Sequence, residues 1–194
     1  MPFTENWYSD GQLVDLCRLY DEVRDVPGLI VEFGCWQGKS TVALANACYP
    51  DRVRAVDHWR GNIDESPENA TVALARERDV YAEFVENIRM YTKGNVDVFR
   101  MDWRSFIKEL GPRPQNAIKF CHIDASHDYP SVRDNIAAVL PLLASRAVLC
   151  GDDFQSASSE RFDLHGGVER AVRELLNGFR SNGNLWYWMK NESK

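Results

Sequence analysis

Short apolar segments of strand length alternate along this chain with longer segments whose apolar residues recur at helical spacing. Most of the apolar segments are closed by a glycine or an aspartate. Such alternation predicts right-handed strand–helix–strand crossovers, and therefore a mainly parallel sheet with helices on both faces. The expected strands are residues 29–33, 52–56, 96–101, 117–123, 147–150 and 185–189.

Helical segments are expected between these strands, so the fold class is α/β, Rossmann-like and doubly wound. The expected helices are 39–47, about 70–91, 103–110, about 130–143 and about 167–177. An extra helix through Leu13 and Tyr20 should precede the first strand and pack over the site or over one edge. The chain is thus expected to form one domain, 1–194, with an N-terminal helical cap (1–27) and a core (28–194).

The C-terminal edge of the sheet looks short, because the sequence shows one clear strand there, at residues 185–189. Two alternatives follow. Either residues 179–182 form a stunted partner strand, or a second copy of the chain completes the edge in a homodimer.

Charge and composition limit the partners of the protein. Lysine and arginine number 23 against 29 aspartate and glutamate residues, a net charge of −6, which disfavours nucleic acid and favours a small-molecule substrate. Apolar runs of about 18 residues and a signal peptide are absent from the sequence, so we expect a cytoplasmic protein with no membrane association. The cysteines form no Cys-x-x-Cys pair and are expected to be reduced thiols.

Carboxylates follow strand after strand: Asp57, Asp102, Asp124, Asp152 and Asp153. In open α/β sheets, ligands bind just beyond the carboxyl ends of the strands. Strand-ending aspartates also commonly cap the next helix or turn. For Asp124 with the adjacent pair Asp152 and Asp153 we favour a cation site, because three caps do not require three anionic side chains.

The turn after the first strand, from Gly34 to Thr41, is rich in glycine and hydroxyl groups. A phosphate-binding loop of the ATPase type needs four residues between its glycines, whereas three separate Gly34 from Gly38. A nicotinamide fingerprint needs glycine where Trp36 stands, which disfavours an NAD(P)-linked oxidoreductase. S-adenosylmethionine has no pyrophosphate, so this looser loop suffices for it.

Several residues would then bind S-adenosylmethionine. Gly34 would let the backbone approach the amino-acid part, and Asp57, 23 residues later, would accept from both ribose hydroxyls. Asp102 would accept from the adenine amino group and Trp103 would stack on the ring. Glu32 would either accept from the cofactor's ammonium or hold the loop. Further expected cofactor residues are Gly38, Ser40, Thr41, His58 and Asp124.

Four segments, 31–41, 55–59, 123–129 and 151–153, together resemble class I S-adenosylmethionine-dependent methyltransferases. More narrowly, they resemble the metal-dependent O-methyltransferases that act on sugars of macrolides and other natural products. The resemblance covers about residues 28–178 in the correct order. It implies an enzyme that transfers a methyl group from S-adenosylmethionine to a hydroxyl of a small, polyhydroxylated acceptor, assisted by Mg²⁺ or another divalent cation.

Carried over to this chain, the resemblance implies that Asp124, Asp152 and Asp153 bind the metal and that Asp124 and His127 are catalytic, His127 as the base. Catechol-type relatives carry a lysine at the position of His127, so a catechol acceptor is disfavoured. From the residues alone, His127 is equally readable as a helix-entry residue or a further metal contact. Asp128 either orients His127 or favours the helix N-terminus. A non-catalytic module that captures a cation at these acids remains the alternative.

Two polar insertions, about 60–70 and 154–166, flank the carboxyl edge and are expected to shape the acceptor pocket or to act as lids. His122, within a strand, and His165, in a loop, are expected to be structural or solvated. Lys39 is expected to be a solvated charge at a helix start.

Overall fold

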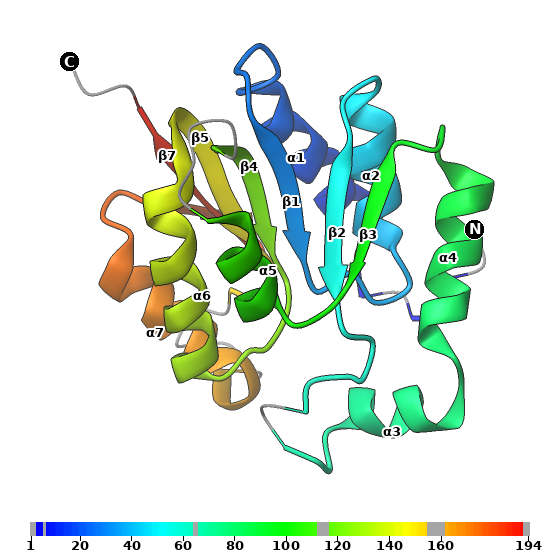
Figure 1. Cartoon of the computed structure of the whole chain (residues 1–194). Helices are drawn as coiled ribbons and strands as arrows, with labels where there is room; N and C mark the ends of the chain where they lie inside the picture. Colours follow the sequence, from blue (N-terminus) through cyan, green and yellow to red (C-terminus); the bar gives the residue numbers. More distant parts are fainter. Residues whose placement is uncertain (1–2, 6, 64–65, 112–116, 155–161, 192–194) are drawn as a thin grey trace.

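A single sheet organises the computed structural model, which describes residues 3–5, 7–63, 66–111, 117–154 and 162–191 (Figure 1). Within these residues, seven strands lie in the order β3-β2-β1-β4-β5-β7-β6. Strands β1 to β5 run parallel, and β7 is antiparallel to both β5 and β6. The strands are β1 (Leu29–Phe33), β2 (Val53–Asp57), β3 (Val96–Arg100), β4 (Ile118–Ile123), β5 (Leu143–Gly151), β6 (Arg180–Asn182) and β7 (Leu185–Lys190). The doubly wound α/β prediction is confirmed.

Helices cover both faces of the sheet because successive residues of a strand point to opposite sides. In β1, Ile30 packs with apolar residues of α1 and α2, whereas Val31 and Phe33 pack with those of α5, α6 and α7. Figure 1 shows these helix sets on opposite faces, with α3 beyond the lower ends of β2 and β3. The helices are α1 (Asp10–Asp21), α2 (Lys39–Cys48), α3 (Ala70–Glu77), α4 (Val80–Tyr91), α5 (Trp103–Leu110), α6 (Tyr129–Val139) and α7 (Phe162–Leu175).

The helix expected over 70–91 is two helices. Arg78 is extended, with φ −148°, and the side chain of Asp79 accepts from the Ala82 amide at 3.0 Å to start α4. A short 3₁₀ turn, η2 (Leu140–Leu142), separates α6 from β5, which therefore begins earlier than the expected strand 147–150.

Helix α7 begins at Phe162 and includes His165, which was expected in a loop. Two consecutive glycines, Gly166 and Gly167, make this stretch a poor helix former. Tertiary packing explains the difference: a Cβ at Gly167 would lie 2.3 Å from the His127 carbonyl oxygen, so only glycine lets α7 pack this closely on the turn before α6.

At the C-terminal edge, β6 consists of three exposed residues that pair with β7. The stunted partner strand is therefore confirmed, and the chain forms this edge itself; the homodimer stays a prediction. Within the described part of the chain, no helix has both the length and the apolar character that crossing a membrane requires.

Candidate functional site

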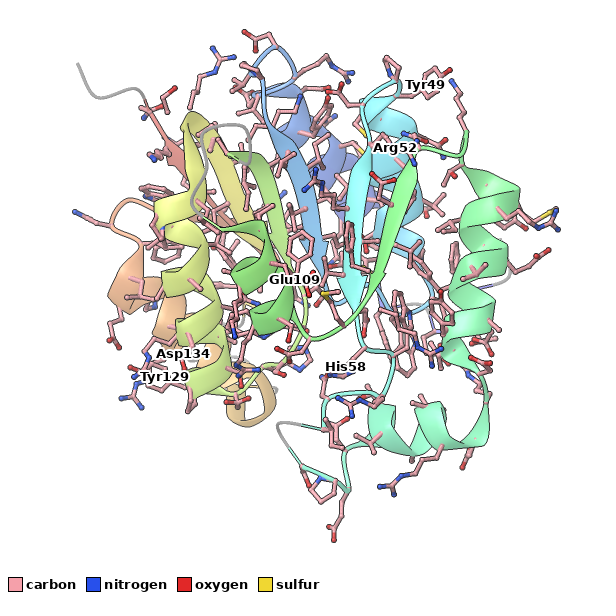
Figure 2. The ribbon with its side chains drawn as sticks, viewed as in Figure 1. Tyr49, Arg52, His58, Glu109, Tyr129 and Asp134 are labelled. Carbon is pink, nitrogen blue, oxygen red and sulfur yellow. The ribbon has the colours of Figure 1, made fainter. Side chains whose placement is uncertain are left out.

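A cavity of about 560 Å³ lies at the edge where β1, β2, β4 and β5 end. Small-molecule sites typically occupy roughly 300–1,000 Å³. The sequence-predicted residues that line it are Gly34, Ser40, Asp57, His58, Asp102, Trp103, Asp124, His127, Asp152 and Asp153. Figure 2 shows one of them, His58, at the lower edge of the sheet, where the chain leaves β2. Glu32, Gly38 and Thr41 do not belong to the described lining.

The turn between β1 and α2 needs its glycines for two different reasons. Gly34 has φ +82°, and a Cβ there would lie 1.9 Å from the Asp124 carbonyl oxygen, so the turn passes directly against the end of β4. Gly38 has φ +86°, and a Cβ there would lie 2.9 Å from the Phe84 ring. Gly34 therefore brings this turn next to Asp124, whereas Gly38 permits close packing on α4.

Asp57 holds the same turn from the end of β2. Its Oδ2 accepts from the amides of Cys35 and Trp36 at 2.8 and 3.0 Å, and its Oδ1 accepts from the Trp59 amide at 2.6 Å. A carboxylate offers about two acceptor positions on each oxygen. Among these contacts Oδ1 accepts one bond and Oδ2 two, so Oδ1 is the oxygen with capacity for a ligand; the predicted contact to both ribose hydroxyls stays a prediction.

Asp102 and Trp103 lie at the start of α5. The Oδ1 of Asp102 accepts from the Arg104 amide at 2.8 Å and so caps the helix. Trp103 is buried beside Phe33, at 6.4 Å between ring centroids, and the Arg104 guanidinium lies 4.4 Å from its ring centroid. Asp102 and Trp103, the two residues predicted to contact adenine, both line the cavity, and Asp102 also caps the helix.

A cluster of possible metal ligands lies at the ends of β4 and β5. Asp124, His127 and Asp153 each offer one ligand atom, and these atoms all lie within 4.8 Å of one another. The Nε2 of His127 is 2.8 Å from Oδ2 of Asp153. Asp152 was expected in this cluster, but its Oδ1 accepts from Gln12 Nε2 of α1 at 3.3 Å. Thus His127 joins Asp124 and Asp153, and Asp152 lies beside them.

Burial and mutual repulsion disturb the ionisation of these acids. Burial, followed by the charges of Asp152 and Asp153, raises the pKa of Asp124 to about 7. Burial and the charge of Asp153 raise the pKa of Asp152 to about 6. A divalent cation would relieve both effects, because it supplies the positive charge that the site lacks.

We expect the protein in EDTA to lose stability as the pH rises from about 4 to about 7 because of the raised pKa of Asp124. The pKa of Asp124 is about 7 in the folded protein and about 4 in an unfolded chain. Between these two values the folded state binds more protons than the unfolded chain, so its stability falls with rising pH until Asp124 is ionised in the folded state as well. Thermal melts should show a lower Tm at the higher pH. A Tm that increases across the window would contradict the repulsion.

A buried chain of hydrogen bonds lies behind Asp124; sequence reasoning missed Tyr8, and it expected His122 to be structural or solvated, of which the structural alternative agrees with its burial. The Tyr8 hydroxyl donates to Asp124 Oδ2 at 3.0 Å and lies 3.1 Å from His122 Nε2. His122 Nδ1 lies 3.1 Å from Glu32 Oε1, and Thr41 donates to the other oxygen of Glu32. Burial by itself would lower the pKa of His122, but the hydrogen bond and charge of Glu32 outweigh it and raise the pKa.

The N-terminal segment, defined here as residues 3–5 and 7–9, is tied to the walls of the cavity. The Thr4 amide donates to Gln37 Oε1 at 3.0 Å, and Glu5 accepts from Arg78 and from the Trp36 indole at 2.6 and 3.0 Å. Lys39, expected to be solvated, donates instead to the Tyr8 carbonyl. These contacts hold Tyr8 over the cavity.

The expected insertions are placed only in part. Gly61, Asn62 and Asn69 of the first insertion line the cavity, and Asn62 Nδ2 lies 3.3 Å from His127 Nδ1. Residues 155–161 of the second insertion lie outside the described residues. Asp128 caps α6 by accepting from the Ser131 amide at 3.0 Å, which agrees with its helix-start alternative.

Comparison with known proteins gives one family. A family model described as a methyltransferase domain matches residues 31–154, and a search of the curated proteins finds no match. Three solved structures show how similar the fold is. CalS11, a calicheamicin methyltransferase also described as a TDP-rhamnose 3′-O-methyltransferase, shares 19% identity over 93% of this chain and 80% of its own, with a TM-score of 0.63.

The O-methyltransferase NovP shares 17% identity over 93% of this chain and 80% of its own, with a TM-score of 0.67. TomG from Streptomyces achromogenes, an O-methyltransferase involved in tomaymycin synthesis and solved with S-adenosylmethionine, shares 18% identity over 98% of this chain and 84% of its own, with a TM-score of 0.66. At these identities the similarity concerns the fold.

Proposed function

The chain belongs to the methyltransferase domain family, and from this premise we propose that it is a divalent-metal-assisted, S-adenosylmethionine-dependent O-methyltransferase. Its acceptor is a small, sugar-like or polyhydroxylated natural product. The observation that carries the proposal is the convergence of Asp124, His127 and Asp153 beside the Gly34 turn, at one end of a cavity of small-molecule size. The similar CalS11, described as a TDP-rhamnose 3′-O-methyltransferase, supports a sugar acceptor.

The methyl donor belongs in the part of the cavity lined by the Gly34 turn. Gly34 and Ser40 would contact its amino-acid part, Asp57 Oδ1 a ribose hydroxyl, and Asp102 with Trp103 the adenine. His58, next to Asp57, would line the same pocket. A sulfonium is positively charged, which suits a cavity with this many carboxylates. The predicted residues away from the lining support the turn instead: Glu32 and Thr41 through their mutual hydrogen bond, and Gly38 through packing.

The cluster fits a divalent cation. Carboxylate oxygens suit Mg²⁺ and Mn²⁺, and an imidazole nitrogen within the same cluster is compatible with Mn²⁺ and the later transition metals. Asp124 and Asp153 would hold the ion, and Asp152 would add negative charge beside it. When bound, the ion supplies positive charge that lowers the pKa of an acceptor hydroxyl and orients its neighbouring oxygen.

Methyl transfer needs positioning and the removal of one proton. The acceptor oxygen attacks the methyl carbon in line with the carbon–sulfur bond; the carbon–oxygen bond forms as the carbon–sulfur bond breaks, and S-adenosylhomocysteine leaves. His127 Nε2 faces Asp153, 2.8 Å from Oδ2. With Nε2 directed at Asp153, we assign the hydroxyl proton to Nδ1 of His127, where the acceptor hydroxyl would replace the Asn62 amide that lies 3.3 Å away; Asp153 then stabilises the imidazolium that forms.

The test is methyl transfer to a panel of nucleotide sugars and glycosylated natural products, with Mg²⁺ and with EDTA. We expect turnover with Mg²⁺, a loss of at least about 10²-fold in EDTA because a bound cation supplies several kcal/mol, and recovery when Mg²⁺ or Mn²⁺ is returned. S-adenosylhomocysteine should still bind in EDTA by calorimetry. Activity that survives thorough chelation would remove the metal, and tight NAD(P) binding without S-adenosylmethionine binding would establish an oxidoreductase instead.

Other expectations stay predictions. They are one methyltransferase domain over 1–194 with a helical cap at 1–27, a cytoplasmic location, a homodimer, and no nucleic-acid or membrane partner.

A further inference from the structure

Tyr8 reaches Asp124 from a part of the sequence far from it, across 116 positions. The tyrosine is 5% exposed, and its hydroxyl lies 3.0 Å from Asp124 Oδ2 and 3.1 Å from His122 Nε2. A hydroxyl has one hydrogen, and an ionised carboxylate only accepts. Tyr8 therefore donates to Asp124, and its oxygen accepts from His122 Nε2.

The residues behind Tyr8 are fully buried and connected. His122 and Glu32 are each 0% exposed, and they occupy paired positions of the neighbouring strands β4 and β1. Glu32 in turn accepts from Thr41 near the start of α2. The Tyr8 hydroxyl is thus held from behind by the sheet itself, and not by a surface side chain.

Tyr8 is also fixed through its backbone. Its carbonyl accepts from Lys39, and the next residue, Ser9, begins α1 with a capping box in which Ser9 and Gln12 satisfy each other's backbone amides. The side-chain torsion of Asp124 does not fix its carboxylate by itself, because the χ2 angle of an aspartate has broad minima. Within the described residues, the hydrogen bond that this carboxylate accepts comes from the Tyr8 hydroxyl. A donor at a fixed position therefore decides how the carboxylate is turned.

We propose that Tyr8 is a positioning residue that fixes the carboxylate of Asp124 in the orientation needed to bind a divalent cation, with His122 and Glu32 holding the Tyr8 hydroxyl in place. This inference rests on the proposed function, since it requires a cation at Asp124. Hydrogen-bonding partners of metal ligands typically contribute about 10- to 100-fold to metal affinity.

The experiment measures Mn²⁺ binding by calorimetry, without cofactor or acceptor, to the wild type, Tyr8→Phe and Tyr20→Phe. Tyr20 is the matched control: it is also a buried tyrosine near the N-terminus, but its hydroxyl donates to Asp51 at 3.4 Å. Asp51 precedes the first residue of β2, at the opposite end of this strand from the cavity. We expect Tyr8→Phe to weaken Mn²⁺ binding by about tenfold. Tyr20→Phe should bind Mn²⁺ like the wild type, and all three should bind S-adenosylhomocysteine within about twofold of one another.

Each outcome supports or overturns the proposed positioning role of Tyr8. Mn²⁺ affinity of Tyr8→Phe equal to or above that of the wild type would overturn the inference while leaving the proposed function standing. A wild type that does not bind Mn²⁺ would overturn the metal-assisted function and the inference with it. His122→Gln, which alters the support of the hydroxyl without touching Asp124, should also weaken Mn²⁺ binding, and it carries the test if circular dichroism shows Tyr8→Phe unfolded.

Discussion

Replacing Asp124 with asparagine should abolish methyl transfer and at the same time stabilise the protein in EDTA. Asparagine keeps the size of the side chain and an oxygen that accepts from the Tyr8 hydroxyl, but it removes the negative charge that holds a cation. A bound cation is worth several kcal/mol of transition-state stabilisation, so we expect turnover with Mg²⁺ to fall by about 10³-fold or more. Initial rates at saturating S-adenosylmethionine, across a Mg²⁺ titration, measure this.

The gain in stability follows from the same charge. Burial and the charges of Asp152 and Asp153 penalise the ionised Asp124 carboxylate, and asparagine has no charge to penalise. Above about pH 7 in EDTA the variant should therefore melt at a higher temperature than the wild type, and its Tm should change less with pH. Such an exchange of stability for activity is common at functional sites.

Asp134→Asn is the matched control for this variant. Asp134 lies on α6, where it pairs with Arg133 at 2.6 Å, and its side chain is 50% exposed. Figure 2 shows it on α6, away from His58 at the end of β2. Rate and Tm should both stay near those of the wild type. An Asp124→Asn enzyme that retains Mg²⁺-dependent turnover would show that the cation binds elsewhere.

The sheet could be predicted because its central strands are buried on both faces and read as continuous apolar runs. The break between α3 and α4 could not be predicted, because the contacts that favour it are distant in sequence. Arg78 leaves the helix and donates hydrogen bonds to Thr4 and Glu5, more than seventy positions away. The early start of α7 is similar, because the packing of Gly167 on the His127 turn overrides local propensity.

The position of the site at the strand ends follows from topology, and so the strand-ending acids could be predicted to converge. His127 as a further metal contact was among the alternatives, but the position of Asp152 beside the cluster could not be predicted. Asp153 has φ +60°, a conformation that L residues rarely adopt and that the sequence does not reveal. The pairing of Glu32 with His122 could have been predicted. Each of the two lies two residues before the first residue of the loop that follows its strand, Gly34 or Asp124, and the two strands were expected to be neighbours. Tyr8 had no local signal at all.

Replacing His127 with alanine should lower kcat by about 10²- to 10⁴-fold near neutral pH, the range expected when a general base is removed. The side chain is 17% exposed, so its loss leaves space at the cavity wall rather than a hole in the core. Because the missing group is a proton acceptor, turnover of the variant should increase with pH up to higher values than that of the wild type. Added imidazole should restore part of the rate at neutral pH.

Mn²⁺ titration of the same variant separates the two roles that the geometry allows, since His127 lies both beside Asp153 and within the ligand cluster. A base acts on the acceptor, so its loss lowers kcat even at saturating Mn²⁺ and leaves the Mn²⁺ affinity within about threefold of the wild type. A ligand acts on the cation: its loss should weaken Mn²⁺ binding by about 10-fold or more, and saturating Mn²⁺ should then restore most of kcat. The second pattern, without rescue by imidazole, would reassign His127 from proton acceptor to metal ligand and leave the proton to another acceptor at the cavity.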